Sequence, residues 1–529
     1  MRLLPVGERA VLAEFPCTED VHRMWLALEA GRPAGIDEVV AGARTLLFVV
    51  AEDAGDPFAV VSRLPEPAGP AGGRRPRTVS IPVTYDGPDL AGVAEMAGLD
   101  PDEVVRLHSG ETYTVGFLGF SPGFAYLFGG HPRLAVPRLA SPRTSVPAGS
   151  VALAGDMTAV YPQSTPGGWR IIGRTGTAMF DPFRAAPALL APGDRVRFRP
   201  VEDAPSAPTS GLGSGSRSAL RATPGADDRG GLEILDPGLL LTVQDMGRRG
   251  WAHAGVPLSG AADRRSAALA NHLVGNPPEA AVLESTLGTC RLRLRHDRVV
   301  AVTGAAADVT VDGLPARRHV GLPLRAGSEL TVGRAGDGAR MYIAVAGGLE
   351  VDAVLGSRST DTLSGLGPAP LRRGDVLPLG TTVGSSRRGR PPVTTAKVTP
   401  LPGPTRSIEV QARLGPRADW LSPAGLAALG ESAFRVGGSS DRTGVRLQGP
   451  ALRLDRSEQL PSEGMVAGAV QVPPDGQPIV LMRNHPPTGG YPVVAVVDDE
   501  GVDALAQAAP GDTVRLCLSP ARTPGSGRG

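Results

Sequence analysis

AGSVALAGDMTAVYPQSTPGGWRII, at residues 148–172, returns in altered form as AGAVQVPPDGQPIVLMRNHPPTGGYPVV at residues 467–494. In each copy an Ala-Gly pair opens an alternating strand pattern, and a polar stretch with proline leads to two glycines and an aromatic residue. A Gly-Asp turn and a basic strand follow, as PGDRVRF at residues 192–198 and PGDTVRL at residues 510–516. Matching residues lie at nearly constant separations, which is typical of a duplicated supersecondary unit. The repeat predicts two related domains that could meet and form a site between them.

The size and composition of the chain set the class of protein around this repeat. A chain of 529 residues is too long for one hydrophobic core and predicts about three or four domains. Hydrophobic residues make up 41% and charged residues 20%, as in ordinary soluble proteins. The 71 glycines and 52 prolines favour a turn-rich, mainly β fold with α+β parts. A formal net charge of +1 gives no reason to expect a nucleic acid or an anionic membrane as a partner.

Several kinds of chemistry are excluded by the residues that the chain lacks. Its single lysine, Lys397, lies in VTTAKVTP, so a Walker A loop, a Schiff-base lysine and a biotinyl-lysine are not expected. Cys17, Cys290 and Cys517 form no CxxC pair, and no histidines have metal-ligand spacing, so we expect no metal site. The start of the chain does not read as a signal peptide, and no apolar run is long enough to span a membrane. These features predict a cytoplasmic protein.

Changes in composition divide the chain into units. Helix signals cover residues 19–30, 100–108 and 262–273, and strand patterns include residues 45–50, 232–243, 299–303 and 340–345. The segments at residues 202–230 and 384–405 are poor in large apolar residues and are predicted to be linkers. The expected division is a small α/β domain at residues 1–75, a β-barrel or sandwich domain at 76–201, a linker at 202–230, a β-rich domain at 231–383, a linker at 384–405, a domain with the second copy of the repeat at 406–520 and a disordered tail at 521–529.

Six of the aromatic residues lie in YTVGFLGFSPGFAYLF, at residues 113–128. Phe120, Pro122 and Gly123 lie in a turn that would expose backbone amides beside flat apolar faces, which suits a planar or anionic ligand. The same composition also fits an aromatic plug under a loop. His108, just before this segment, could carry a proton or be a structural histidine. Both alternatives stay open for the turn and for the histidine.

Two further passages combine glycine with polar or aromatic residues. The Gly-Gly-aromatic turns at Gly168-Trp169 and at Tyr491 either approach a ligand closely or form tight hairpins without one. Residues 243–276, VQDMGRRGWAHAGVPLSGAADRRSAALANHLVGN, are the densest polar and glycine-rich passage. Its polar residues favour a binding role, although a helix cap with a surface partner would use the same residue types. These polar residues are Gln244, Asp245, Arg248, Asp263 and Asn271.

Longer motifs make the chain recognisable as two known families in series. GFLGFSPGFAYLFGG at residues 116–130, the segment at residues 137–176 and FDPF at residues 180–183 resemble the B subunit of 5-oxoprolinase, whose family is also called allophanate hydrolase subunit 1 or the kinase-inhibitor family. VQDMGRRG, GVPLSGAAD, LANHLVGNPPEAAVLE, VAGGLEV, LGSRSTD, SSDRTGVRLQG and GAVQVPPDGQPIVL with TGGYP resemble its C subunit, or allophanate hydrolase subunit 2, of biotin-dependent carboxyltransferase type. The chain looks like a natural fusion of the two subunits.

The resemblance implies a fold and a reaction. It implies cyclophilin-like β-barrels in both halves. It also implies ATP-dependent opening of 5-oxo-L-proline to L-glutamate, in which these two subunits activate the lactam and hydrolysis is completed by a separate A subunit. ATP with Mg²⁺ is then the expected cofactor, and no biotin is attached to this chain. The alternatives are the carboxyltransferase component of a biotin-dependent urea carboxylase and a non-enzymatic regulator of a histidine kinase. The sequence leaves open whether the chain forms a homo-oligomer.

Activating a lactam oxygen requires cations and amide donors aimed at the developing charge, and arginines within the family motifs fit that role. We expect His108, Arg143, Asp245, Arg248 and Asp263 to be catalytic, where the two halves meet. The expected substrate- or nucleotide-binding residues are Phe120, Pro122, Gly123, Tyr161, Gly168, Trp169, Gln244, Asn271, Arg358, Arg442, Arg446, Gln471 and Tyr491.

Two stretches depart from the family patterns. The usual Pro-Arg-Arg before SPR is Pro137-Arg138-Leu139 here, and the glycine loop before the Gly-Asp of the second family is GLGPAPLRRGD at residues 365–375. Either change could shift the substrate preference of the chain.

Overall fold

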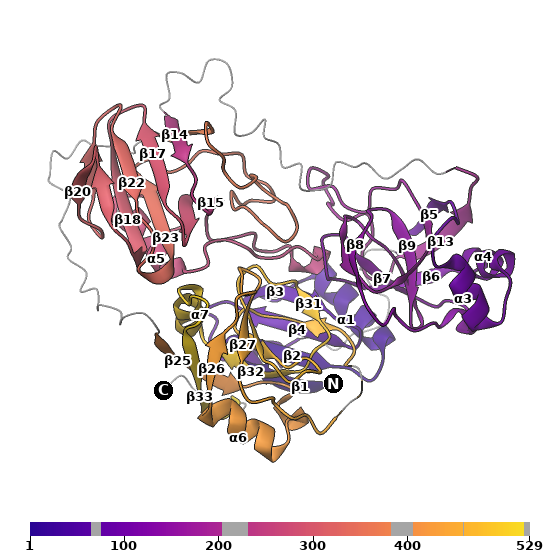
Figure 1. Cartoon of the computed structure of the whole chain (residues 1–529). Helices are drawn as coiled ribbons and strands as arrows, with labels where there is room; N and C mark the ends of the chain where they lie inside the picture. The colour runs from indigo at the N-terminus through magenta and orange to yellow at the C-terminus, as the bar shows by residue number, and fades with distance from the viewer. Residues whose placement is uncertain (65–75, 204–230, 382–405, 457, 459, 523–529) are drawn as a thin grey trace.

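The computed structural model describes residues 1–64, 76–203, 231–381, 406–456, 458 and 460–522 (Figure 1). The predicted linkers at residues 202–230 and 384–405 and the predicted tail at 521–529 lie almost wholly outside these residues. The domain boundaries stay a prediction. Strands dominate the described chain, so the mainly β class is confirmed.

The N-terminal unit is a four-stranded antiparallel sheet in the order β1-β2-β4-β3, covered by helices. Its strands are short runs of Val, Leu, Ile and Phe, which favour a pleated, half-buried surface. Its elements are β1 (Arg2–Val6), β2 (Ala10–Glu14), α1 (Thr18–Ala30), β3 (Ile36–Ala41), β4 (Thr45–Val50) and α2 (Pro57–Val61). Helix α1 and strand β4 agree with the predicted helix and strand.

The first barrel follows and holds seven strands in the order β12-β9-β10-β7-β6-β13-β5. β13 pairs parallel with β5, and a bridge between Thr84 and Arg174 joins the two ends of the sheet. Its elements are β5 (Thr78–Val83), α3 (Leu90–Ala97), α4 (Pro101–Gly110), β6 (Tyr113–Leu118), β7 (Ala125–Phe128), η1 (Pro132–Leu134), β8 (Arg143–Val146), β9 (Ser150–Ala154), β10 (Met157–Val160), β11 (Thr165–Gly167), β12 (Arg170–Arg174) and β13 (Arg195–Pro200).

The middle unit packs a six-stranded sheet, β20-β19-β22-β17-β14-β24, against a five-stranded sheet, β15-β16-β23-β18-β21. Helix α5 covers β18 and β23. The elements are β14 (Gly231–Asp236), β15 (Leu240–Gln244), η3 (Ala252–Ala254), α5 (Arg264–Leu273), β16 (Val282–Thr286), β17 (Cys290–Leu294), β18 (Arg298–Ala306), β19 (Val309–Val311), β20 (Leu314–Ala316), β21 (Leu322–Leu324), β22 (Glu329–Val332), β23 (Asp337–Val345) and β24 (Val376–Pro378).

The second barrel is closed, in the order β25-β32-β29-β30-β27-β26-β33. Its elements are β25 (Ser407–Leu414), η4 (Ala418–Trp420), α6 (Pro423–Glu431), β26 (Ala433–Val436), β27 (Gly444–Gln448), β28 (Glu463–Gly464), β29 (Ala469–Gln471), β30 (Ile479–Leu481), β31 (Thr488–Gly489), β32 (Val493–Val497), α7 (Asp499–Ala506) and β33 (Thr513–Ser519). Taken strand by strand from β5 and β25, the two barrels have the same order, with the last strand parallel to the first in both. The repeat in the sequence therefore corresponds to two barrels of one topology.

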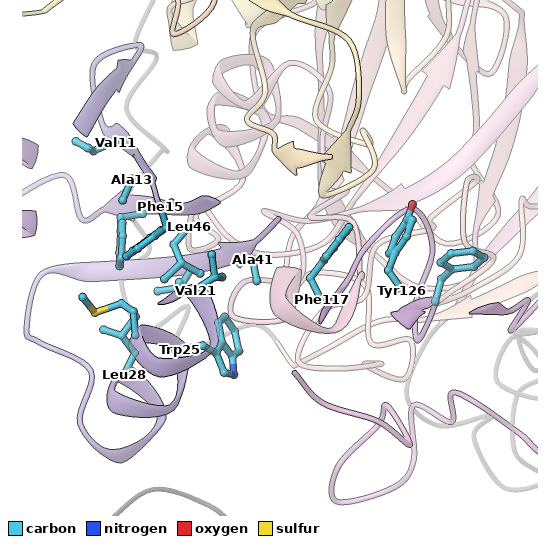
Figure 2. Close-up of a cluster of buried hydrophobic side chains, with 14 of the residues drawn as sticks. Val11, Ala13, Phe15, Val21, Trp25, Leu28, Ala41, Leu46, Phe117 and Tyr126 are labelled. Atoms are coloured by element: carbon cyan, nitrogen blue, oxygen red, sulfur yellow. The ribbon is translucent and has the colours of Figure 1, made fainter. Parts of the chain in front are cut away.

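The N-terminal sheet connects the two barrels through both of its faces. One face, with Leu46 of β4, packs with Trp25 of α1 and shares a core with Phe117 and Tyr126 of the first barrel (Figure 2). The other face packs on the second barrel, where Leu12 lies in one core with residues such as Val496. Figure 1 accordingly shows β1–β4 beside β32, although these strands are far apart in the sequence.

Two element predictions need correction. The strand expected over residues 232–243 is two strands, β14 and β15, because Gly238 takes a left-handed conformation (φ 66°) and turns the chain between them. The helix expected from residue 262 begins at Arg264, since the Asp263 carboxylate accepts the Ser266 amide and so acts as the N-cap.

Candidate functional site

A pocket of about 880 Å³ lies where the N-terminal sheet, the segment after β15 and the second barrel meet. The turn between β1 and β2 and part of β3 line it from the first half of the chain. Residues of the segment after β15, with Arg264 of α5, line it from the middle unit. Loops and strand ends of the second barrel complete the wall. The pocket thus lies between the two halves, where a small-molecule site is commonly found.

A turn rich in arginine and glycine, residues 247–250, contributes part of this wall. Gly247 and Gly250 both have φ in the left-handed region, at 92° and 86°, so this path favours glycine at both positions. Asp245 fixes the entry to the turn: its carboxylate accepts the Gly247 amide at 2.8 Å, the Ser357 hydroxyl at 2.7 Å and the Arg358 amide at 2.6 Å. Asp245 thereby fastens the turn to the loop at residues 357–358.

Arg248, in this turn, is 1% exposed and lines the pocket. Its Nη1 donates to the Ser359 hydroxyl at 2.9 Å, and its Nη2 donates to the Ser359 carbonyl. Both partners are neutral, and Nε has no partner among the residues that the structure describes. Burial lowers the pKa of Arg248, and the nearby carboxylates of Asp361 and Asp245 oppose this shift. The guanidinium is therefore held in place without a direct counter-charge in the described part of the chain.

Arg264, at the start of α5, reaches the same turn through an Nη2 bond to the Met246 carbonyl at 2.9 Å. Burial and the neighbouring guanidinium groups of Arg483 and Arg249 lower the pKa of Arg264 to about 9. Arg483 pairs with Asp499 at 3.1 Å and Asp503 at 3.0 Å. The pocket therefore has a cluster of four arginines, residues 248, 249, 264 and 483, of which Arg483 alone has an ion pair among the described residues.

His485 brings an acceptor nitrogen to the same pocket. Its Nδ1 lies 2.8 Å from the Pro486 carbonyl, which can only accept, so Nδ1 carries the proton and Nε2 has the free lone pair. Burial lowers the pKa of His485 to about 4, so the ring is neutral at pH 7. A neutral Nε2 can accept a proton or a hydrogen bond from a ligand.

Contacts from the first half hold the other walls in position. The Glu38 carboxylate of β3 accepts the Gly250 amide, so the N-terminal sheet fixes the end of the arginine turn. Burial raises the pKa of this carboxyl. The amide of Phe120 donates to the Thr488 hydroxyl at 3.1 Å, which joins the first barrel to the second. Phe120 has φ 63°, an uncommon conformation for a bulky residue, and this bond helps to hold it.

The structure brings one of the eighteen predicted site residues to the lining of the pocket. This residue is Arg248. Gln244, Asp263 and Asn271 are buried and tied to the fold: Gln244 donates to Thr242 and to the Thr360 carbonyl, Asp263 caps α5 and accepts from Gln507, and Asn271 donates to two loop carbonyls. Burial raises the pKa of Asp263. These contacts fit structural roles.

His108 does not fit the role of proton carrier. It is fully buried in the first barrel, and its ring nitrogens lie 2.8 Å from the Tyr85 hydroxyl and 3.0 Å from the Thr158 hydroxyl. Its ring stacks on Phe198 at 4.5 Å, and burial lowers its pKa to about 3. The geometry is that of a structural histidine.

The aromatic residues of the turn pack against one another, as the alternative of an aromatic plug under a loop predicts. Phe124 meets Tyr161 edge-on at 5.1 Å and Trp169 at 5.6 Å, and the rings of Tyr161 and Trp169 are buried. Pro122 and Gly123 lie in the turn above, where the Gly123 amide donates to the Ala254 carbonyl. The carbonyl of Gly168, beside Trp169, accepts the Leu139 amide. Aromatic packing and contact with the other half account for this segment.

The remaining predicted residues are spread over the molecule. Arg143 pairs with Asp89 at 2.7 Å in the first barrel, and Arg442 is buried against Glu284. Arg358 donates to the Val351 carbonyl, and Gln471 to the Tyr491 carbonyl. Arg446 is exposed, as is Tyr491 at 44%.

Sequence reasoning missed Glu38, Arg249, Arg264, Arg483 and His485. Arg249 and Arg264 stand inside the polar passage at residues 243–276, and the two adjacent arginines after glycine in GRRG were an available signal. Glu38, Arg483 and His485 lie in ordinary strand and loop contexts. Their convergence depends on packing between distant segments.

The described residues contain no group of three or more His, Cys, Asp or Glu side chains placed to hold a metal ion. None of the helices in the described ranges has both the length and the apolar character needed to cross a bilayer.

Comparison with known families agrees with this architecture. Residues 1–190 match the model of the carboxyltransferase domain, subdomain C and D, and residues 254–518 match that of subdomain A and B. The crystal structure of TTHA0988 superposes with a TM-score of 0.84 at 34% identity, covering 96% of this chain and 99% of that one.

Named relatives match the two halves separately. The 5-oxoprolinase C subunit of Escherichia coli K12 is 37% identical over 282 residues, which is 52% of this chain and 87% of the relative. The 5-oxoprolinase B subunit of E. coli O157:H7 is 41% identical over 207 residues, 37% of this chain and 95% of the relative. Urea amidolyase of Saccharomyces cerevisiae is 31% identical over 303 residues, but only 16% of that protein is covered. The chain therefore belongs to the carboxyltransferase-domain family and joins, in one polypeptide, regions related to the B and C subunits of 5-oxoprolinase.

Proposed function

We propose that this chain is the B and C component of an ATP-dependent 5-oxoprolinase, which activates 5-oxo-L-proline for ring opening to L-glutamate by a separate A subunit. The observation that carries the proposal is the pairing of both relatives, each nearly complete, on one chain. The pocket between the corresponding halves supports it, since residues from both regions line the wall.

The chemistry of the pocket suits this substrate. A lactam carbonyl is a poor electrophile, and ATP would supply the phosphoryl group that activates its oxygen. The chain's own contribution is cationic: Arg248, Arg249 and Arg264 can bind anionic groups and stabilise charge as it develops. The neutral Nε2 of His485 offers an acceptor suited to the lactam N–H. No described cluster of ligands would hold Mg²⁺ by itself, so Mg²⁺ would enter with the nucleotide phosphates.

The test is ADP formation by the purified full chain with 5-oxoproline, with urea and with neither, each with and without an added A subunit. Turnover stimulated by 5-oxoproline when the A subunit is present, with release of glutamate, is the expected result. 2-Pyrrolidinone, which has the lactam but lacks the carboxylate, is the matched control and should be turned over poorly. If 5-oxoproline gave no stimulation in the mixture that includes the A subunit, the proposal would be overturned.

A second candidate is a carboxyltransferase component that acts with urea. The family match to carboxyltransferase subdomains and the likeness to urea amidolyase favour it. Transfer of carboxyl from carboxybiotin to urea, in the absence of any 5-oxoproline-dependent turnover, would select this candidate.

A further inference from the structure

Three arginines of the pocket have no ion pair among the described residues. They are Arg248, Arg249 and Arg264, which line one cavity. Nε of both Arg248 and Arg264 is buried and has no partner in the described ranges. Removing a guanidinium from water without a counter-charge is unfavourable, so such groups are normally paired. Arg248 and Arg264 bear this penalty, which indicates an anion that the described residues do not provide, and the exposed Arg249 lies beside them.

The nearby carboxylates are already engaged elsewhere. Asp245 holds the amides of residues 247 and 358, and Asp361 accepts the amides of residues 363 and 364. Asp503 accepts from Arg483 and from the Arg264 amide, and Asp499 pairs with Arg483. Glu38 accepts the Gly250 amide. These bonds hold the carboxylates in place around the cluster, and none is a hydrogen bond to one of the three guanidinium groups.

The geometry points to a ligand with several negative charges. A single carboxylate carries one charge and offers two oxygens, whereas a phosphate chain offers several oxyanions that guanidinium forks match well. We propose that Arg248, Arg249 and Arg264 form a phosphate-binding subsite that takes the terminal phosphate groups of a nucleoside triphosphate. The identity of the nucleotide as the natural ligand rests on the proposed function, but phosphate binding can be measured without it.

The subsite needs both halves of the chain. Glu38 of the N-terminal sheet accepts the Gly250 amide at the end of the arginine turn. Arg264 bonds the Met246 carbonyl just before the turn, so α5 fixes its other side. Glu38 is therefore a positioning residue for this subsite.

The experiment measures thermal unfolding of the full chain at constant ionic strength, with potassium chloride replaced by inorganic phosphate, tripolyphosphate or ATP. Wild-type protein should unfold at a higher temperature with tripolyphosphate and ATP than with chloride, because a ligand that binds the folded state stabilises it. Arg264→Met and Arg249→Met should each weaken the apparent affinity about tenfold, the loss of one charge-assisted bond. Arg317→Met, at an exposed arginine outside the pocket, is the matched control and should bind as wild type does.

A second readout separates a ligand site from a structural role. Arg264→Met loses its bond to the Met246 carbonyl, so its unfolding temperature without ligand should fall, and its affinity is read from the rise that the ligand causes above that lower value. Arg249 is exposed, so its variant is expected to fold in any case. Absence of stabilisation of the wild type by tripolyphosphate and ATP would overturn the assignment, as would equal stabilisation of wild type and both variants. Stabilisation by 5-oxoproline alone, lost in the variants, would assign the cluster to a carboxylate and overturn the phosphate subsite. Failure of 5-oxoproline turnover with phosphate binding intact would overturn the proposed function only.

Discussion

The two barrels have one topology but opposite charges at matching positions. The Asp89 amide donates to the Ile171 carbonyl at 2.9 Å in the first barrel, and the Arg417 amide donates to the Val493 carbonyl at 3.0 Å at the matching place in the second. The side chain of Asp89 pairs with Arg143, opposite Gly167, whereas that of Arg417 pairs with Glu463, opposite Gly489. The backbone frame has been kept after duplication while the sign of each charge has been exchanged.

The difference extends to what each barrel does. The first pair is partly open, with the side chains 28% and 12% exposed, and stays within its own barrel. The second pair is buried, at 9% and 4%, and Arg417 also bonds Glu14 of the N-terminal sheet at 2.8 Å. The second barrel thus uses this position to bind another part of the chain, and it also lines the pocket. A shared fold therefore does not predict which copy forms a site.

The largest expected contrast concerns the aromatic residue of each Gly-Gly turn. Trp169 is 5% exposed and packs on other rings, so Trp169→Ala should lower the free energy of unfolding by about 3–5 kcal/mol. Tyr491 is 44% exposed, so Tyr491→Ala should change it by less than about 0.5 kcal/mol. Denaturant unfolding of both variants measures the contrast. Equal losses would show that the two turns are alike in packing.

The ion pairs Asp89–Arg143 and Arg417–Glu463 should also differ in how much their loss lowers the free energy of unfolding. Arg417→Met leaves the buried Glu463 without its partner and should cost about 3–5 kcal/mol, whereas Arg143→Met breaks a partly exposed pair and should cost about 1 kcal/mol or less. The control is Arg417→Met combined with Glu463→Met, which removes both charges and should restore much of the stability on denaturation. A double variant with a lower free energy of unfolding than Arg417→Met alone would contradict this explanation.

Each barrel contains a buried histidine. The pH dependence of the free energy of unfolding should show that each ring is kept neutral in the folded state. Burial lowers the pKa of His108 to about 3 and that of His485 to about 4, below the unfolded value of about 6.5. Each neutral ring contributes stability that is fully present above pH 6.5 and is lost as the pH falls toward the folded-state value. Between pH 7 and 5, His108→Asn should therefore lose about 2 kcal/mol less than wild type in unfolding free energy. An unchanged pH dependence in His108→Asn would contradict the assignment.

The smallest effect concerns the contact between the barrels. Thr488→Val removes the acceptor of the Phe120 amide and should cost about 1 kcal/mol, while Thr488→Ser keeps the hydroxyl and should be nearly neutral. Hydrogen exchange of the Phe120 amide should become faster in the valine variant alone. Equal exchange in both variants would show that this bond does not protect the amide.

The repeat and the family motifs predicted the fold well. Both consist of glycine and proline turns and of alternating apolar and polar residues, and these are local features of the sequence. The site was predicted less well. Asp245, Asp263 and Asn271 looked like chemical groups beside glycines, but holding an irregular loop requires the same residue types. Arg264 and Arg483 meet because α5 and the second barrel pack together, and no local pattern records this. The hypothesis of a site between the halves came from the duplication, and the pocket lies there.

The packing of the N-terminal sheet on the second barrel has a consequence for how the pocket depends on protein concentration. Two walls of the pocket come from segments more than four hundred residues apart, yet they belong to one polypeptide. Their association is intramolecular, so it is governed by an effective concentration that is on the order of millimolar for tethered modules. Dilution to nanomolar protein should therefore leave the pocket assembled, and specific activity should not fall through separation of these walls.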